Sequence, residues 1–547
     1  MHAAFALAAL LLQSAPQSAP AEREISCDIL IAGGSFGGCA AAVALEGRDV
    51  WMVEDCDWIG GQVTSQGVSA LDEHKYIESF GGTQTYTQFR NAVRAAYGGV
   101  KNPGGGWVSR LCFEPKVGLR LLEEMTRATP KLLSSKLTSA EVKDDRVVAV
   151  CARAADGALT RFLPKMILDA TDTGELLALA GIEHRTGTEA RDETGEPHAG
   201  EKADPDRTQS FTYPFAVEFR KGERHENPRP RGYERFRDRQ PYSLDLPTWD
   251  GKTLRFGFFE KREGTPGPFW TYRRLTPEIA MINWPGNDYR GTPLLRADHD
   301  EAKRLSLGFL HWLQTECPRD DGGRGYPELW LRRDVMGTED GLSKRPYVRE
   351  GRRLVAKTRI VEQDLTPETA RARLFSDTVG LGWYSLDLHS CAGEEAERGG
   401  LGIPTKPFQI PLGALVPVRV RNVLAAGKCL GVTHVTNGAY RLHPIEWNCG
   451  ESAAHTAAFC LERGKEPAEL LGSPELLRAL QARLLDAGVP IFWFVDLTAE
   501  HPAWAAAQAL AVWGEWSAAP DHLEARLTKE RTAELVARYA KARARVR

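Results

Sequence analysis

Four glycines close to the start of the chain have the spacing of a phosphate-binding turn. They lie in the run Gly-Gly-Ser-Phe-Gly-Gly at residues 33–38, and Glu54 follows at the end of the next apolar segment. The first N–H groups of a helix carry a partial positive charge and bind phosphate. A carboxylate at Glu54 accepts hydrogen bonds from ribose hydroxyls and repels a 2′-phosphate. These residues predict a dinucleotide site that takes FAD or NAD rather than NADP.

The segments around the turn are those that such a site requires. Residues 28–32 predict an apolar strand, the small residues 39–42 predict a helix that can lie close to a sheet, and residues 49–53 predict a second strand. Together they make a βαβ unit. Ser35 stands where a middle glycine usually lets the backbone approach pyrophosphate. Serine is small enough to fit there, and its hydroxyl can donate to phosphate.

Composition sets the broad class of the protein. At 547 residues the chain is too long for one ordinary core, so we expect two or three domains. A hydrophobic content of 42% and a charged content of 26% are ordinary for a folded protein. The formal net charge of −3 gives no general attraction for nucleic acid or for an anionic membrane. We therefore expect no nucleic-acid partner.

The first residues differ from the rest of the chain. Residues 3–12 are unbroken apolar, and a small, proline-rich stretch follows to residue 21. This segment is too short for a stable membrane span but has the length of a signal-peptide core. No Lys or Arg precedes it. We expect residues 1–22 to be a signal peptide that exports the protein to the periplasm or the exterior; the alternatives are a disordered tail on a cytoplasmic protein and a misplaced start codon.

The ten cysteines show no C-x-x-C pair and no Cys/His spacing suited to zinc or iron–sulfur ligation. We therefore expect no metal site and no redox-active disulfide. Pairing of Cys429 with Cys449 stays open.

Three later segments have the residues to line a dinucleotide. Residues 60–65 carry adjacent glycines, which let the backbone pass beside a cofactor. An apolar strand runs into residues 169–171, Asp-Ala-Thr. After a strand at residues 422–428 and a loop at 434–443, residues 444–454 predict a small-faced helix. Its N-terminus would stabilise the negative charge of a reduced flavin, or the helix merely packs on the sheet.

The order and spacing of these segments resemble FAD-dependent oxidoreductases of the two-domain, glutathione-reductase-like type over most of residues 25–460. The resemblance implies FAD and a Rossmann-like α/β FAD-binding domain, with a mostly parallel sheet and helices on both faces. It implies an inserted mixed α+β substrate domain and a helical C-terminal extension. The boundaries we expect are 23–185 and 405–462 for the FAD-binding domain, 186–404 for the substrate domain and 463–547 for the extension.

The resemblance also implies the residues that contact the cofactor. They are Gly33, Gly34, Ser35, Phe36, Gly37, Gly38, Glu54, Asp55, Gly60, Gly61, Gln62, Val142, Asp169, Ala170, Thr171, Gly427, Gly450, Glu451 and Ser452. In this scheme Val142 and residues 169–171 meet the adenine side, and residues 450–452 lie against the isoalloxazine. Many relatives have Gly-Asp where this chain has Gly427-Lys428, so the ribityl contact from position 428 is not carried over.

Proton transfer needs an acid/base group near the flavin-facing helix. His443, beside Arg441 and just before that helix, is the first choice, and His389 and His434 come second because a structural role accounts for each equally well. A substrate carboxylate or oxyanion needs a cation. The arginines considered for this role are Arg349, Arg352 and Arg353, although arginines near a glutamate also predict surface ion pairs.

The sequence thus predicts an FAD-dependent oxidoreductase that moves a hydride between flavin N5 and a small organic substrate, sugar-like or carboxylate-bearing, with an unidentified electron acceptor. Two alternatives remain at this point. One is an NAD-dependent dehydrogenase, and the other is a secreted protein that binds flavin without catalysis.

Overall fold

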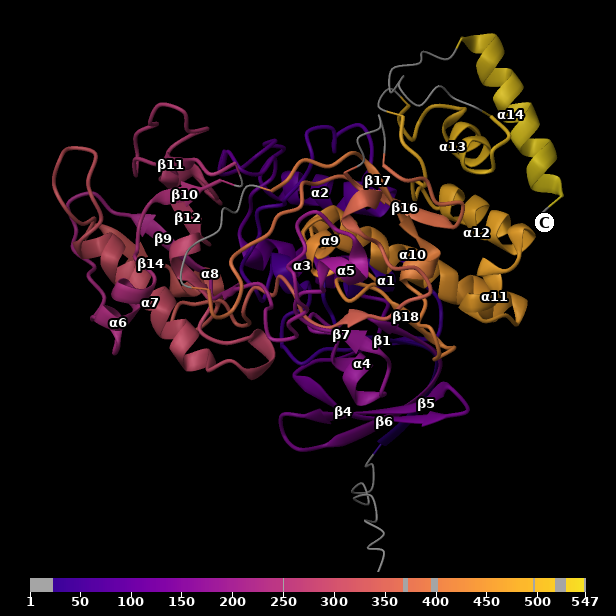
Figure 1. Ribbon diagram of the computed structural model, residues 1–547, viewed down its shortest axis with the longest axis horizontal. Coiled ribbons are helices and arrows are strands. Elements are labelled where there is room, and N and C mark those ends of the chain that lie inside the picture. Colours follow the sequence, from indigo (N-terminus) through magenta and orange to yellow (C-terminus); the bar gives the residue numbers. More distant parts are fainter. Residues whose placement is uncertain are drawn as a thin grey trace, which may run out of the picture.

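The computed structural model describes residues 23–248, 250–366, 372–394, 402–494, 497–516 and 528–545. The predicted signal peptide, residues 1–22, lies outside the described residues. The described chain is a mixed α/β structure built around one sheet that is mostly parallel (Figure 1).

Five parallel strands form the centre of the molecule, in the order β3-β2-β1-β6-β18. These strands are β1 (Arg23–Ala32), β2 (Val50–Val53), β3 (Lys131–Leu132), β6 (Leu159–Asp169) and β18 (Val423–Ala425). β18 pairs with the carboxyl end of β6, with Val423 opposite Ile167. Two distant pieces of the chain therefore complete one sheet.

The amino-terminal half of β6 pairs with an antiparallel hairpin instead of with β18. The hairpin consists of β4 (Ser135–Lys143) and β5 (Arg146–Ala154), and it lies at the bottom of Figure 1. Asp144 and Asp145 form its turn with φ values of 50° and 55°. Aspartate tolerates this left-handed conformation better than most residues, so the two aspartates suit the turn.

Two helices from opposite ends of the chain pack together beside the sheet. These are α1 (Phe36–Ala44) and α10 (His443–Arg463). A Cβ atom on Gly450 of α10 would lie 1.9 Å from the carbonyl oxygen of Gly37 in α1. Only glycine fits at this crossing, which explains the small residues on both helices.

The segment before α10 is a helix, so the predicted loop at residues 434–443 is wrong. Helix α9 (His434–Tyr440) begins after Thr433, whose Oγ1 accepts from Thr436 N at 3.1 Å. Thr436 Oγ1 accepts in return from Thr433 N at 2.9 Å. This reciprocal capping starts a short helix that hydrophobic periodicity alone does not reveal.

In the described part of the chain, eight further helices surround the main core, and the last four of them form the predicted helical extension. They are α2 (Gln84–Ala96), α3 (Pro115–Met125), α4 (Glu175–Leu179), α5 (Arg191–Thr194), α11 (Pro467–Leu471), α12 (Pro474–Asp486), α13 (Trp504–Val512) and α14 (Lys529–Ala544). The last four lie together at the right of Figure 1. Leu535 and Tyr539 of α14 are buried, so the arginine-rich end is a surface-packed helix.

A second hydrophobic core lies at the left of Figure 1, apart from the first. Its sheet has the order β12-β9-β14, made of β9 (Phe215–Phe219), β12 (Ile279–Ile282) and β14 (Leu329–Leu331). Helices α6 (Tyr233–Arg239) and α7 (His299–Thr315) belong to the same core. Aromatic side chains dominate it; Phe258 and Tyr326 stack with ring centroids 4.0 Å apart.

Short strand pairs complete the two cores, the first two pairs in the second core and the last two in the first. They are β8 (Phe211–Thr212) with β13 (Asp288–Tyr289), β10 (Asp245–Pro247) with β11 (Thr253–Arg255), β7 (His184–Arg185) with β15 (Arg353–Leu354), and β16 (Thr378–Gly382) with β17 (Phe408–Pro411). The short helix α8 (Arg333–Met336) follows β14.

All ten cysteines are described; they are free and buried, so Cys429 and Cys449 are not paired. Within the described ranges, no helix combines the length and apolar character needed to cross a bilayer. The same part of the chain holds no group of side chains that could bind a metal ion.

Candidate cofactor site and catalytic cleft

The glycine turn after β1 has the geometry expected of a dinucleotide loop. Gly33 has φ of 99°, and a Cβ atom there would lie 2.4 Å from the carbonyl oxygen of Ala170. Ser35 caps α1, because its Oγ accepts from Gly38 N at 3.3 Å. The serine that departs from the glycine pattern therefore shapes the first turn of the helix.

Glu54 leaves the end of β2 and reaches the same turn. Its Oε2 accepts from Gly34 N at 2.6 Å, and its Oε1 accepts from Cys56 N at 2.9 Å. Burial and then the charge of Asp55 raise the pKa of the Glu54 carboxyl group well above its usual range. The carboxyl group is thus fixed beside the phosphate turn, at the strand end where the sequence predicts it.

A cavity of about 460 Å³ opens at the carboxyl ends of these parallel strands. In open α/β sheets this edge is where nucleotides bind. The predicted cofactor residues that line it are Gly33, Glu54, Asp55 and Thr171. Its charged lining residues that the cofactor prediction did not include are Lys136, Asp172, Glu175, Arg345 and Arg352. Arg352 therefore lies on the cofactor side, where its Nη1 donates to Thr173 O at 3.2 Å.

Asp169 shapes the turn after β6. Its Oδ1 accepts from the backbone N and the hydroxyl of Thr171 at 3.0 and 2.7 Å. Burial raises the pKa of Asp169 to about 6. Its side chain stabilises the Asp-Ala-Thr turn from inside.

Lys428, at the position where the resemblance implies an acidic residue, is paired with a carboxylate. Its buried Nζ lies 2.7 Å from Oδ1 of Asp172 and donates to Val348 O at 2.9 Å. Asp172 thus supplies the carboxylate from another segment.

A buried carboxyl group from α10 reaches the N-terminus of α1. Glu446 Oε1 accepts from Gly37 N at 3.4 Å, and Glu446 also bonds the side chain of Gln62. Burial raises the pKa of Glu446, although Lys428 opposes the shift. Gln62 Nε2 also donates to Arg441 O at 3.3 Å, which links this end of the turn to the start of α10.

The residues at this site fit FAD. Gln62 Oε1 is buried and has no hydrogen-bond partner in the described structure. A Cβ atom on Gly427 would have no neighbour closer than 3.6 Å, so there is space between Ser35 and Glu446. A helix N-terminus, a free buried acceptor and an adjoining cavity are what a dinucleotide needs.

Four predicted cofactor residues lie elsewhere. Val142 is 38% exposed and pairs with Val147 near the hairpin turn. Gly450 packs on α1, Glu451 Oε2 accepts from Thr85 Oγ1 at 2.6 Å, and Ser452 Oγ donates to Val379 O at 2.7 Å. Residues 450–452 lie about two turns beyond the start of α10, so the structure gives them packing contacts in place of the predicted position at the flavin.

His443 is buried with both ring nitrogens engaged by the backbone. Nδ1 accepts from Asp72 N at 2.9 Å, and Nε2 lies 3.1 Å from the oxygen of Val68. Burial lowers the pKa of His443 to about 4. The imidazole is therefore neutral and positions residues 68–72, which leaves it without a nitrogen for proton transfer.

His389 has the opposite environment. Its Nδ1 lies 2.8 Å from Oδ2 of Asp288, and its Nε2 lies 3.6 Å from Oδ2 of Asp387. Burial and Arg349 lower the pKa of His389, but the two carboxylates outweigh them and raise it above its usual value. His389 therefore holds a proton more readily than an ordinary histidine.

Buried ion pairs surround His389. Arg441 Nη2 lies 2.7 Å from Oδ2 of Asp387, and Arg349 Nη2 lies 2.9 Å from Oδ1 of Asp288. Arg353 is also buried, paired with Glu189 at 2.7 Å. The prediction of surface ion pairs is wrong for Arg349 and Arg353. Both side chains are buried and pair with carboxylates from distant segments.

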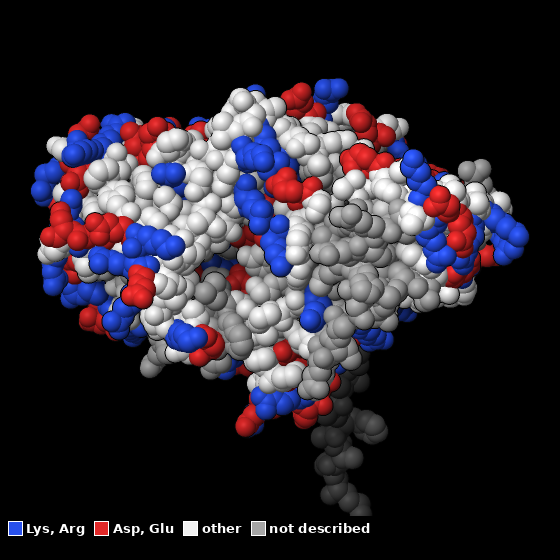
Figure 2. Space-filling view, turned by 90° about the horizontal axis from the view of Figure 1, so that it is seen from above, with Lys and Arg blue, Asp and Glu red and all other residues white. Residues whose placement is uncertain are grey.

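His389 lines a cleft of about 1200 Å³. Its walls come from residues 188–207, 247–248, 251–253, 386–394, 402–403 and 434–435. On the face seen from above, Figure 2 shows a hollow in which acidic and basic side chains are visible. A polar cleft that holds a titratable histidine suits a small polar substrate.

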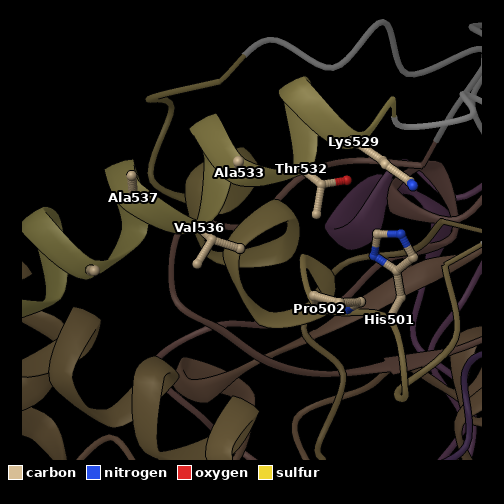
Figure 3. Close-up of a pocket in the computed structure, with 8 residues that line it drawn as sticks. His501, Pro502, Lys529, Thr532, Ala533, Val536 and Ala537 are labelled. Atoms are coloured by element: carbon tan, nitrogen blue, oxygen red, sulfur yellow. The ribbon is translucent and has the colours of Figure 1, made fainter.

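Another groove, of about 540 Å³, lies between α14 and residues 501–502. Figure 3 shows Val536, Ala533 and Ala537 on one side of it and Pro502 on the other. Lys529 and His501 are its only charged or titratable lining residues. This groove brings together no set of acid/base groups. The cleft that holds His389 is therefore the better candidate for the active site.

A family model for FAD-dependent oxidoreductases matches residues 28–484. The chain belongs to this family. FAD is accordingly the cofactor, and the protein is an oxidoreductase. The family assignment rules out the two alternatives that the sequence left open, which were an NAD-dependent dehydrogenase and a non-catalytic flavin-binding protein. The comparison with curated proteins gave no match.

Solved structures of flavoproteins match parts of the chain. L-proline dehydrogenase from P. horikoshii matches at 16% identity with a TM-score of 0.17, covering 34% of this chain and 31% of that one. A flavoprotein/dehydrogenase from Cytophaga hutchinsonii matches at 14% identity with a TM-score of 0.22, covering 36% and 45%. The substrate-free rebeccamycin biosynthetic enzyme RebC matches at 15% identity with a TM-score of 0.22, covering 36% and 40%. The matched part is less than half the length of each of these proteins, and at such TM-scores the likeness supports no inference about this chain.

Most of the buried charged partners of Lys428, His389, Arg441 and His443 could not be found from the sequence. They are Asp72, Asp172, Arg273, Asp288 and Asp387. No local spacing connects them, because each comes from a different segment. The one available signal is Lys428, a cation in a buried strand-to-helix connection, which requires an acidic partner.

Proposed function

We propose that this protein transfers a hydride between FAD and a small polar compound that carries a hydroxyl group and a carboxylate, such as a hydroxy acid or a sugar acid. The observation that carries the proposal is a continuous line of contacts from the N-terminus of α1 to the cleft. It runs from Gly37 through Glu446 and Gln62 to Arg441, and on through Asp387 to His389.

The line of contacts supports a joint site because its central residues are buried and its last two, Asp387 and His389, are largely shielded. Glu446, Gln62 and Arg441 are at most 1% exposed. Groups so placed interact through little water, so a charge at one end of the line affects the other more than at a surface. The cofactor turn and the titratable histidine thus belong to one electrostatic unit.

His389 is the acid/base group in this proposal. The bound FAD supplies two-electron redox chemistry by taking a hydride from a carbon atom of the substrate. A hydroxyl on that carbon must lose its proton for a carbonyl to form, and His389 accepts this proton. Asp288 holds Nδ1 and fixes the ring, so that Nε2 is the nitrogen turned to Asp387 and available for proton exchange. Above its raised pKa His389 is neutral and able to act as the base.

Two arginines favour a carboxylate-bearing substrate. The Nε atoms of Arg273 and Arg441 are buried without hydrogen-bond partners in the described structure. Both guanidinium groups face acids, Asp72 at 3.2 Å and Asp387 at 2.7 Å. A guanidinium with a free N–H recognises a carboxylate or an oxyanion well.

Spectroscopy of the purified protein tests the proposal. We expect a flavin absorbance spectrum that is bleached under anaerobic conditions by at least one member of a panel of 2-hydroxy acids, sugar acids and polyols. Flavin that is reduced by dithionite but by no member of the panel would contradict the substrate class.

We also keep export as a proposal, because residues 3–12 form an apolar stretch before a small, proline-rich segment. Amino-terminal sequencing of the protein from its native source tests it. A mature N-terminus near residue 22 would support export, and an intact residue 2 would contradict it.

A further inference from the structure

The cleft contains a second cluster of chemistry-bearing side chains, which the hydride transfer does not use. It consists of Cys391, His434 and Glu350. The sulfur of Cys391 lies 3.7 Å from Nε2 of His434, and Nδ1 of His434 lies 2.8 Å from Oε2 of Glu350. Cys391 and His434 both line the cleft. A thiol, an imidazole and a carboxylate in this order form a nucleophile, its base and the group that orients the base.

The contacts of Glu350 determine which nitrogen of His434 faces the thiol. Glu350 is 1% exposed, accepts from Gln209 N at 2.9 Å and is paired with Arg353. These donors keep it ionised, so it accepts the hydrogen on Nδ1 of His434. The lone pair of Nε2 therefore faces the Cys391 sulfur and is free to accept the thiol proton.

A cation lies beside the sulfur. The pKa of the Arg207 guanidinium is lowered by burial but raised overall by Glu394 and by its contact with Cys391. Glu394 pairs with Arg207 and accepts from Cys391 N at 2.9 Å, which holds the guanidinium next to the cysteine. Positive groups next to a cysteine stabilise its thiolate.

The other cysteines provide the contrast. The sulfur atoms of Cys39 and Cys429 face backbone carbonyl groups, those of Gly34 and Asp169. Burial raises the pKa of Cys112 to about 12. Such thiols are inert at neutral pH, whereas Cys391 has a base and a cation at a large cleft.

We propose that Cys391 is a nucleophilic thiol that forms a reversible covalent bond with the carbonyl carbon of an aldehyde in the cleft. The reactivity of the thiol rests on the cluster alone. The carbonyl class rests on the proposed function, because hydride removal from a hydroxyl-bearing carbon produces a carbonyl compound.

The reaction balances without an outside reagent. Nε2 of His434 takes the proton from the thiol of Cys391. The sulfur then attacks the carbonyl carbon, and a C–S bond forms as the C=O π bond breaks. The carbonyl oxygen takes the proton back from His434, so that a thiohemiacetal forms and no electrons leave the system. Glu350 stabilises the imidazolium during the transfer and remains ionised.

Alkylation of the flavin-loaded protein with iodoacetamide tests the thiol, with peptide mass spectrometry to follow all ten cysteines. At pH 6.5 we expect Cys391 to react at least about tenfold faster than any other cysteine, and His434→Gln or Glu350→Gln to slow it about tenfold. The visible flavin spectrum shows whether each variant is folded. Because a variant can fail to fold, the alkylation rate of Cys391 in the wild-type protein is also measured from pH 5 to 9. We expect this rate to stay high below pH 8.

Glycolaldehyde tests the carbonyl class, with ethylene glycol at the same concentration as the matched control. We expect glycolaldehyde to slow alkylation of Cys391 and ethylene glycol not to. Alkylation of Cys391 at the rate of the other cysteines would overturn the proposal, whether or not the protein shows redox activity. Fast alkylation without protection by glycolaldehyde would overturn the aldehyde adduct. Neither outcome depends on flavin reduction, so failure of the proposed function is seen separately.

Discussion

The cofactor turn and the cleft differ in how their residues are distributed along the chain. The turn, from Gly33 to Glu54, is built within one βαβ unit and reads directly from the sequence. The acid/base cluster at the cleft brings His389 together with Asp288 and Arg441, and these residues come from three separate segments of the chain. Binding of the cofactor is therefore encoded locally, whereas the chemistry performed on the substrate depends on long-range packing.

The largest expected effect lies in the turn. Gly33→Val places a side chain 2.4 Å from Ala170 O at a positive φ. We expect loss of bound flavin and destabilisation by roughly 3 kcal/mol or more. Flavin absorbance per protein and urea unfolding measure both.

The matched control for this change is Gly47→Ala, which has φ of 81° and no atom within 4 Å of the added Cβ. This substitution should lower the stability by about 1 kcal/mol because of the positive φ, and it introduces no steric clash. Retention of flavin by Gly33→Val would show that the local turn is not the cofactor site.

The second prediction compares the two histidines. We expect His389→Gln to slow flavin reduction by substrate roughly 100- to 10,000-fold while flavin stays bound. His443→Gln breaks the contacts to Asp72 N and Val68 O and should destabilise the fold by about 2 kcal/mol. Stopped-flow absorbance separates the two, and the reverse pattern of effects would return the acid/base role to His443.

These histidines also show what could be predicted from the sequence. Position next to the flavin-facing helix favoured His443, but the backbone of residues 68–72 occupies both of its nitrogens. No residue near His389 in the sequence indicates that Asp288 contacts its ring. The βαβ unit and the Asp144–Asp145 turn were predictable because local sterics determine them. The contacts of the two histidines depend on which distant segments meet.

The third prediction concerns the pH at which the cleft works. Asp387→Asn removes one of the two charges that raise the pKa of His389. The rate of flavin reduction should rise with pH as His389 loses its proton, and the midpoint of this rise should lie at lower pH in the variant than in the wild type. An unchanged midpoint would indicate that another group controls the profile.

The last prediction concerns Glu451, which the resemblance assigns to the flavin and the structure places beside Thr85. Burial raises the pKa of Glu451 to about 7. Below pH 4.5 both the folded and unfolded forms are protonated, and between pH 4.5 and 7 the unfolded chain loses its proton first, so stability falls as pH rises. Glu451→Gln should therefore exceed the wild type by about 3 kcal/mol above pH 7 and match it below pH 4.5. Urea unfolding at both pH values measures this, and loss of flavin in the variant would instead favour a cofactor contact.

A crystal structure of the protein with its bound flavin tests the central claim most directly. We predict electron density for the pyrophosphate at the first turn of α1, and for the flavin ring on the side of Gln62 and Arg441, facing the cleft that holds His389. Flavin bound elsewhere, or a folded protein that takes up none, would contradict the account.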